Sequence, residues 1–163
     1  MDAFIRSASD RDIEAVSRLL GQCWHETYDS IHGAERVEAI TAEWHSPSAL
    51  KNQINLPGSE FLVADTGKAL VGMAYARQDG KSVMLSQIYV LAKAQGTGLG
   101  TAFLQEMIEC FPEAEKIVLE VDKANENAIG FYMAGGFAIT GKTENCGKAG
   151  SGISALIMEF PIV

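Results

Sequence analysis

Apolar residues in the first third of the chain recur at three- and four-residue steps. Over residues 13–27 this spacing places them on one face of an α-helix. Ser9, with Asp12 three residues later, forms a capping pattern that begins a helix. A second helical pattern covers residues 34–44, and a third begins at a proline and covers residues 47–54. The pattern therefore predicts three helices before the first long strand.

The middle of the chain changes to short apolar, β-branched runs separated by turn residues. The runs cover residues 60–65, 70–78 and 82–90. Thr66-Gly67 divides the first two runs, and Asp79-Gly80, a strong two-residue hairpin signal, divides the second and third. These residues predict an antiparallel meander of three strands. Residues 3–6 predict a further strand at an edge of the same sheet.

The second half of the chain alternates between helical and strand patterns. Helices are predicted over residues 99–111 and 125–133, and strands over residues 116–122, 137–142 and 153–161, the last two joined by the glycine-rich residues 145–152. The order strand, helix, strand predicts that residues 82–90 and 116–122 form parallel strands through a right-handed crossover. Because the sequence shows no repeat or linker, we expect one domain over residues 1–163.

A glycine-rich turn separates the strand at 82–90 from the helix that follows it. Gly96, Gly98 and Gly100 stand at alternate positions, where the missing Cβ lets the backbone approach a ligand closely. The first N–H groups of a helix lack internal partners, so such a turn binds anions. The sequence therefore predicts a ligand that carries phosphate. The dinucleotide fingerprint does not fit, because its third glycine would fall one residue later.

A second phosphate-binding pattern is Gly136-Phe-Ala-Ile-Thr-Gly141-Lys142-Thr143, which matches the P-loop motif. That motif requires a helix start at the lysine, so that successive N–H groups wrap around the phosphates. Residues 144–152 are too rich in glycine for a helix, and residues 137–140 have strand character. We therefore treat P-loop nucleotide binding as the least favoured alternative and expect a strand and a turn.

Two motifs together resemble one enzyme family. They are Gln95-Gly-Thr-Gly98-Leu-Gly100 and, further on, Asn125-x-x-Ala128-x-x-Phe131-Tyr132 followed by Gly136-Phe137. Their pairing at this separation is similar to the GNAT superfamily of N-acetyltransferases, which transfer an acetyl group from acetyl-CoA to an amine. The resemblance implies that family's single-domain acyl-CoA N-acyltransferase fold. This is an α/β (α+β) fold with a mixed, mostly antiparallel sheet flanked by helices, in which two central parallel strands splay to admit acetyl-CoA.

The resemblance also implies roles for individual residues. The glycine turn would hold the pyrophosphate of CoA through backbone N–H groups, and the strand edge before it would pair with the pantetheine arm. Tyr132 would stand beside the cofactor sulfur and give the leaving thiolate its proton. The residues expected to bind the cofactor are Tyr89, Val90, Gln95, Gly96, Thr97, Gly98, Leu99, Gly100, Thr101, Asn125, Ala128 and Tyr132.

The residue that removes the proton from the amine is harder to identify. Some members of the family carry a glutamate on the strand before the glycine turn, but residues 82–90 hold no carboxylate. Glu120 and Asp122 share one face of the later parallel strand, and Glu120 is the candidate we carry forward, beside a chain of water molecules. A second departure is Thr97, where the family often has a basic residue, so the phosphate would depend on backbone donors.

The acceptor amine is not defined by these motifs. Trp24, His25 and Tyr28, near the end of the first helix, are expected to form part of its site. Small amines, amino acids, polyamines, and protein N-termini or lysines are all compatible with the sequence. A catalytically silent acyl-CoA-binding domain is the alternative from another functional class. A homodimer is expected by analogy alone.

The composition restricts the possible binding partners and does not further define the fold. The chain of 163 residues has 13 Lys and Arg against 21 Asp and Glu, a formal charge of −8, so it offers no basic patch for nucleic acid or an anionic membrane and weakly favours a cationic substrate. Three cysteines without Cys-x-x-Cys spacing predict neither disulfides nor zinc, and the spacing of the three histidines predicts no metal. No apolar run reaches the length of a membrane span, and we expect a cytoplasmic protein.

Overall fold

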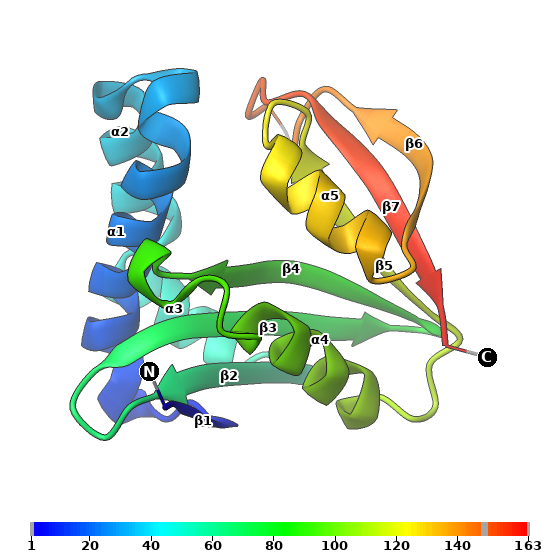
Figure 1. Cartoon of the computed structure of the whole chain (residues 1–163), viewed down its shortest axis with the longest axis horizontal. Coiled ribbons are helices and arrows are strands. Elements are labelled where there is room, and N and C mark those ends of the chain that lie inside the picture. Colours follow the sequence, from blue (N-terminus) through cyan, green and yellow to red (C-terminus); the bar gives the residue numbers. More distant parts are fainter. Residues whose placement is uncertain (1, 148–149, 163) are drawn as a thin grey trace.

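The computed structural model describes residues 2–147 and 150–162 and shows a seven-stranded sheet flanked by helices (Figure 1). The strands are β1 (Phe4–Ser7), β2 (Ser59–Asp65), β3 (Leu70–Asp79), β4 (Ser82–Val90), β5 (Lys116–Asp122), β6 (Ala138–Thr143) and β7 (Ala155–Pro161). The helices are α1 (Ile13–His32), α2 (Ala34–Trp44), α3 (Pro47–Ile54), α4 (Leu99–Cys110) and α5 (Glu126–Ala134), with short 3-10 turns at η1 (Asp10–Asp12) and η2 (Ala92–Ala94). Each helix and strand predicted from the sequence is present.

The strands follow the order β1-β2-β3-β4-β5-β7-β6 across the sheet. Every neighbouring pair is antiparallel except β4 and β5, which run parallel. Parallel neighbours cannot be joined by a tight turn, and α4 supplies the crossover between them. The mixed, mostly antiparallel α/β sheet with one parallel pair is therefore confirmed.

The two parallel strands part soon after they meet. Residues 82–84 of β4 pair with residues 116–118 of β5, and the pairing ends there. In β4 an extra residue, Ser86, stands between the residues that pair with Tyr75 and Ala76 of β3. Such a bulge bends its strand and interrupts regular pairing. The carboxyl-terminal halves of β4 and β5 therefore turn apart and leave their facing edges free for other partners.

Helices cover both faces of the sheet. Figure 1 shows α4 and α5 in front of the sheet and α3 behind it, with α1 and α2 side by side at one end. The apolar face of α4 packs on β2, β3 and β4 and buries Phe103 and Met107 completely. Met73, Ile117 and Met158 of the sheet are equally buried. The apolar helical spacing predicted for residues 99–111 thus forms the face of α4 that packs against the core.

The P-loop alternative is wrong. Gly141, Lys142 and Thr143 lie within β6, and in the described chain no helix begins at the lysine. A strand directs its N–H groups to its neighbours in the sheet, so this segment cannot wrap a phosphate as the motif requires. Over residues 2–147 and 150–162 no helix is both long enough and apolar enough to cross a membrane.

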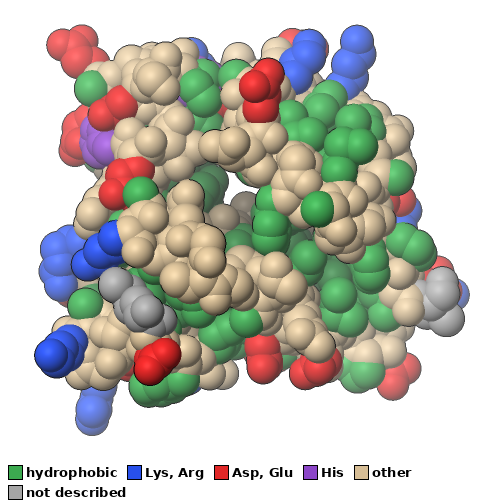
Figure 2. Space-filling view, in the orientation of Figure 1, with side chains coloured by type: hydrophobic (Ala, Val, Ile, Leu, Met, Phe, Trp, Pro, Cys, Tyr) green, Lys and Arg blue, Asp and Glu red, His purple; other side chains and the backbone are tan. Residues whose placement is uncertain are grey.

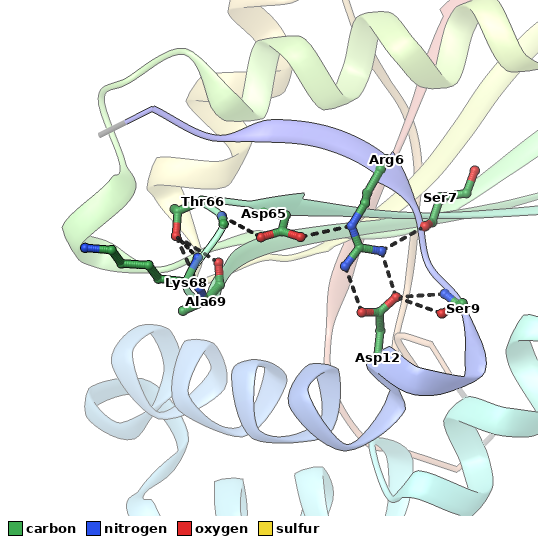
Figure 3. Close-up of polar contacts among 9 residues, drawn as sticks. Arg6, Ser7, Ser9, Asp12, Asp65, Thr66, Lys68 and Ala69 are labelled. Atoms are coloured by element: carbon green, nitrogen blue, oxygen red, sulfur yellow. Dashed lines mark hydrogen bonds and ion pairs between the residues drawn. The ribbon is translucent and has the colours of Figure 1, made fainter.

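A polar cluster ties β1 to the start of α1 and to the end of β2 (Figure 3). The Arg6 guanidinium donates to both carboxylate oxygens of Asp12 at 2.9 Å and, through Nε, to Asp65 at 3.0 Å. Asp12 also accepts from the backbone N–H of Ser9 at 2.8 Å, as the predicted capping pattern requires. The bond from Arg6, followed by that from Ser9, lowers the pKa of Asp12. The charged carboxylate therefore stabilises the fold.

We expect Asp12→Asn to lower the free energy of unfolding by about 1 kcal/mol at neutral pH, because the amide loses the charged pair with Arg6. Folding lowers the pKa of Asp12, so its contribution is present above the unfolded-state pKa and is lost as pH falls through the folded-state pKa. The difference between the two proteins should shrink in acid. Urea unfolding at neutral and acid pH measures this, with Asp10→Asn, an exposed acid in the same turn, as the control. If the two proteins differed by the same unfolding free energy at neutral and acid pH, the proposed contribution of charged Asp12 would be contradicted.

Candidate active site

Two cavities meet at the opening between β4 and β5, and Figure 2 shows that this face of the molecule is hollowed near its centre. The glycine-turn cavity, about 750 Å³, lies between the end of β4 and the starts of α4 and α5. The aromatic cavity, about 370 Å³, is lined by residues of α1, α2, β4 and β5. The two cavities share five lining residues: Ile88, Tyr89, Asn125, Ala128 and Tyr132. Ligands in the two cavities would therefore meet at one wall.

The glycine turn presents free backbone N–H groups to the larger cavity. Gly96 and Gly98 have φ values of 78° and 88°, a conformation that favours glycine. Gly98 directly precedes Leu99, the first residue of α4, and no side chain caps this helix. Within the described chain the N–H groups of Gly96, Thr97 and Gly98 have no hydrogen-bond partner, and those of the first helical turn lack an intrahelical one. The turn can therefore bind an anion through several donors and the positive end of the helix dipole.

The third glycine of the turn is explained by close packing. A Cβ on Gly100 would lie 3.1 Å from the Phe131 ring of α5, so this position lets α4 and α5 approach each other beside the cavity. Gln95, Leu99 and Thr101 line the same cavity. The turn thus shapes the space as well as supplying donors.

Thr97 differs from the other predicted cofactor-binding residues. Its side chain is not part of the cavity lining, and its hydroxyl donates to the carbonyl of Ala94 at 2.6 Å. This bond holds the turn in its conformation. Among the described residues no Lys or Arg lines the glycine-turn cavity. An anion in this cavity would therefore be held by the backbone and the helix dipole rather than by a basic side chain.

The end of β4 forms one wall of the glycine-turn cavity through Tyr89 and Val90. The Gln95 side chain donates to the Val90 carbonyl at 3.1 Å. From the opposite side, the Glu26 carboxylate of α1 accepts from the backbone N–H of Ala92 at 3.0 Å. These side chains occupy backbone groups that a bound amide-containing ligand could use instead, since β5 does not pair with this part of β4.

Asn125 connects the two cavities. Its Oδ1 accepts from the backbone N–H of Ala128 at 3.2 Å and so caps α5, while its Nδ2 donates to the Tyr28 hydroxyl of α1 at 3.3 Å. Burial raises the pKa of Tyr28 and of Tyr132. Both phenols are therefore protonated at neutral pH, and Tyr132 can donate a proton at the wall that the cavities share.

The aromatic cavity is built around Trp24. Its ring centroid lies 4.5 Å from that of Tyr28, 5.7 Å from that of Trp44 and 6.2 Å from that of Tyr89. His45 also lines the cavity, and burial lowers its pKa to about 4. This imidazole is therefore neutral at physiological pH and adds no positive charge. Several aromatic faces and one neutral imidazole form this side of the site.

Two carboxylates from β5 line the opposite side of the aromatic cavity. Glu120 accepts from the backbone N–H of Gly147 at 2.9 Å, and Asp122 bonds to Nε2 of His32 at 2.6 Å. Burial, followed by these two acids, raises the pKa of the Cys146 thiol to about 12, so this cysteine is uncharged. No Lys or Arg lines the cavity among the residues that the structure describes. The charge of the described lining is therefore negative.

The structure places most of the predicted site residues at these cavities. Every residue expected to bind the cofactor except Thr97 lines the glycine-turn cavity, and Trp24, Tyr28 and Glu120 line the aromatic one. His25 lines neither, because its ring nitrogens bond to Asp29 at 2.6 Å and Glu38 at 2.7 Å. In the described ranges no group of three or more His, Cys, Asp or Glu side chains could hold a metal ion.

Sequence reasoning did not assign Trp44 or the pair formed by His32 and Asp122. Trp44 comes from the second helix, whose position relative to the sheet the periodicity does not define. For His32 a signal did exist, because it follows Trp24 and Tyr28 at successive four-residue steps on one side of α1. Its partner stands 90 positions further along the chain.

Comparison with known proteins defines the class. Residues 28–160 match the domain family described as acetyltransferase (GNAT) domain. This match spans most of the chain, and the protein belongs to that family. It is therefore an acyl-CoA-dependent N-acetyltransferase, with acetyl-CoA as the acetyl donor. The resemblance drawn from the glycine turn and the Asn125 to Tyr132 motif is confirmed.

Individual relatives agree with this assignment. Spermidine N(1)-acetyltransferase of Thermoplasma acidophilum is 26% identical over 152 residues, which are 85% of this chain and 90% of that protein. The crystal structure of the PaiA N-acetyltransferase from Thermoplasma acidophilum, in complex with coenzyme A, superposes with a TM-score of 0.86 at 24% identity and covers 99% of both chains. The ribosomal-protein-S18-alanine N-acetyltransferase from Escherichia coli gives a TM-score of 0.75 at 20% identity, over 99% of this chain and 94% of that one. The last two likenesses show the shared fold.

Proposed function

We propose that the acceptor is a small-molecule primary amine that carries additional positive charge, as a diamine or polyamine does. The observation that carries this proposal is the aromatic cavity, where Glu120 and Asp122 face a group of aromatic rings. Carboxylates pair with ammonium groups, and the faces of aromatic rings attract cations. Its volume of about 370 Å³ lies in the range of small-molecule sites.

Two further observations support a cationic acceptor. The formal charge of the chain is −8, and a negative surface raises the local concentration of cations and their rate of association. The relative that is 26% identical over 85% of this chain is named for the acetylation of spermidine, a polyamine. An acceptor whose amine stands beside a carboxylate would instead be repelled by both acids of β5.

The glycine-turn cavity is the proposed binding site of acetyl-CoA. The N–H groups of residues 96–101 would hold its pyrophosphate, and the free edge of β4 at Tyr89 and Val90 would pair with the pantetheine arm once the Gln95 and Glu26 side chains release their backbone partners. When bound, acetyl-CoA supplies an activated thioester carbonyl. Because the cavities share one wall, the acceptor amine would reach this carbonyl by direct attack in a ternary complex.

Two residues at the cavities are proposed to move protons. Tyr132 would protonate the leaving thiolate, since burial keeps its hydroxyl protonated and it lines both cavities. Glu120 would take the proton of the attacking amine through water, as it lines the acceptor side and is half-buried. Trp24 and Tyr28 would hold the acceptor between aromatic faces.

The acceptor class is tested by CoA release from acetyl-CoA against a panel of amines. We expect kcat/KM for diamines and polyamines to exceed that for amines with an adjacent carboxylate by about tenfold or more, because like charge in a desolvated cavity is costly. The kcat/KM for uncharged monoamines should lie between the values for these two classes of amine. A carboxylate-bearing amine as the best substrate would refute the proposed acceptor class.

Replacing Tyr132 with Phe removes the proposed proton donor and little else. We expect kcat to fall about a hundredfold while the Kd for acetyl-CoA stays unchanged, because general acid catalysis acts on the leaving thiolate and not on cofactor binding. Tyr75→Phe is the matched control, since Tyr75 is the one tyrosine of four that lines neither cavity. An unchanged kcat in Tyr132→Phe would rule out Tyr132 as the proton donor to the leaving thiolate.

Replacing Gly98 with Ala tests the proposed pyrophosphate-binding site. Alanine is strained at φ 88°, so the turn should shift its N–H groups and weaken acetyl-CoA binding about tenfold. Gly80→Ala is the control, because Gly80 also has a positive φ, 61°, but lies in the hairpin between β3 and β4. Thermal unfolding should show similar losses for both variants, whereas calorimetry should show weaker acetyl-CoA binding for Gly98→Ala alone. Equal acetyl-CoA affinities in the two variants would contradict pyrophosphate binding by the glycine turn.

A further inference from the structure

A pair of glutamine side chains lines the aromatic cavity away from the wall that the two cavities share. Gln53 belongs to α3 and Gln87 to β4, and both line the aromatic cavity but not the glycine-turn cavity. The Gln53 Nε2 donates to the Gln87 Oε1 at 2.9 Å. The pair therefore adds an uncharged polar surface to a cavity whose other described polar groups include two carboxylates.

The pair leaves hydrogen-bonding capacity unused, because one carbonyl oxygen and one NH2 group stay free whichever amide donates. Within the described chain, Oε1 of Gln53 and Nε2 of Gln87 have no hydrogen-bond partner. Both side chains are partly exposed, and neither atom is among the buried unpaired atoms, so water or a ligand reaches them. The pair can therefore offer the free oxygen of Gln53, and a second lone pair of the Gln87 oxygen, to a ligand that donates.

Other contacts already hold α3 against the sheet. The Tyr75 hydroxyl of β3 donates to the backbone carbonyl of Gln53 at 2.9 Å, and Leu50 of the same helix is completely buried. A single bond between two partly exposed amides adds little to this attachment. The two amides are therefore not required to position α3, and their loss should leave the fold intact.

The glutamine pair lies within reach of the reacting centre. Gln87 stands two residues before Tyr89, which lines both cavities, and the pairing of β4 with β3 is regular between them. Side chains two positions apart lie on the same face of a strand, about 7 Å apart along it. This face is the one covered by α3, on the other side of the sheet from α4 and the glycine turn (Figure 1). An acceptor with its reactive nitrogen at the shared wall could thus place a second group at the pair.

Resting on the cationic acceptor proposed above, we infer that Gln53 and Gln87 form the subsite for the distal nitrogen of a diamine or polyamine. An ammonium group only donates hydrogen bonds, so it satisfies the free carbonyl oxygens. The apolar end of a monoamine would leave these oxygens unpaired in a partly desolvated cavity, at a cost in binding. Glu120 and Asp122 favour positive charge in general, whereas the glutamine pair selects a second donor at a defined distance from the first.

The test measures CoA release with 1,4-diaminobutane and with butylamine, whose carbon chains are equal in length. We expect Gln87→Leu to lower kcat/KM for the diamine about tenfold and to change kcat/KM for butylamine less than about twofold, because only the diamine carries a distal donor. Gln53→Leu should show the same selective loss. A purely structural role of the pair would lower kcat/KM for both amines alike.

Two further variants sharpen the comparison. Gln87→Glu keeps an oxygen that accepts from Gln53 and adds a negative charge beside the distal ammonium, so kcat/KM for the diamine should equal or exceed that of the wild type. Gln78→Leu is the matched control, because Gln78 is also partly exposed and donates to the Gly80 carbonyl at 3.0 Å, but lines neither cavity. It should retain wild-type kinetics with both amines.

Acetyl-CoA affinity and thermal unfolding report whether each variant is folded. If Gln87→Leu failed to fold, Gln53→Leu and Gln87→Glu would decide the question. An equal loss for both amines, or an unchanged kcat/KM for the diamine in Gln53→Leu and Gln87→Leu, would overturn the inference while the diamine remained a substrate. If the wild type acetylated no cationic amine, the proposed acceptor class would fall and the subsite with it.

Discussion

The early separation of β4 from β5 is the constraint on which the site depends. Three paired residues at the start of the two strands keep the sheet continuous, and the extra residue Ser86 bends β4 soon after them. β5 tolerates this because its other edge is paired with β7 along its whole length, as β4 is with β3. Continuous pairing would satisfy the facing backbone groups and fill the space. Both cavities exist because that ladder stops.

The two cavities differ in their electrostatic fields, in a chain with a net charge of −8. Acetyl-CoA carries phosphate and must bind to a protein of like charge. The glycine turn, its proposed binding site, offers backbone N–H groups and a helix dipole, which add no net charge. In the aromatic cavity Glu120 and Asp122 supply the opposite field, which suits the cationic acceptor proposed above. Separate segments, α4 and β5, therefore carry the two fields, and two further acids, Glu26 and Glu126, line the glycine-turn cavity beside the backbone donors.

Periodicity and turn chemistry predicted nearly all of the fold, since each element has a local pattern and Asp79-Gly80 defines the hairpin before β4. The family resemblance, rather than periodicity, led us to expect Asn125 and Tyr132 near the cofactor, and both line the wall that the two cavities share. It did not show that Thr97 would bond to Ala94, which depends on how the turn closes. It also could not separate His25, which α2 engages through Glu38, from His32, which bonds across the opening to Asp122. Such contacts depend on tertiary packing.

α1 links these features because it is held at both ends by charged or titratable pairs. Arg6 binds Asp12 at its start, and His32 bonds to Asp122 at its end, about 30 Å away along a helix of this length. Between them α1 supplies Trp24 and Tyr28 to one cavity and Glu26 to the other. The first pair is structural and lies far from the ligands. The second lies beside the aromatic cavity, where α1 also places Tyr28, the partner of Asn125. Because Asn125 caps α5, the bond between Tyr28 and Asn125 links the start of α5 to α1.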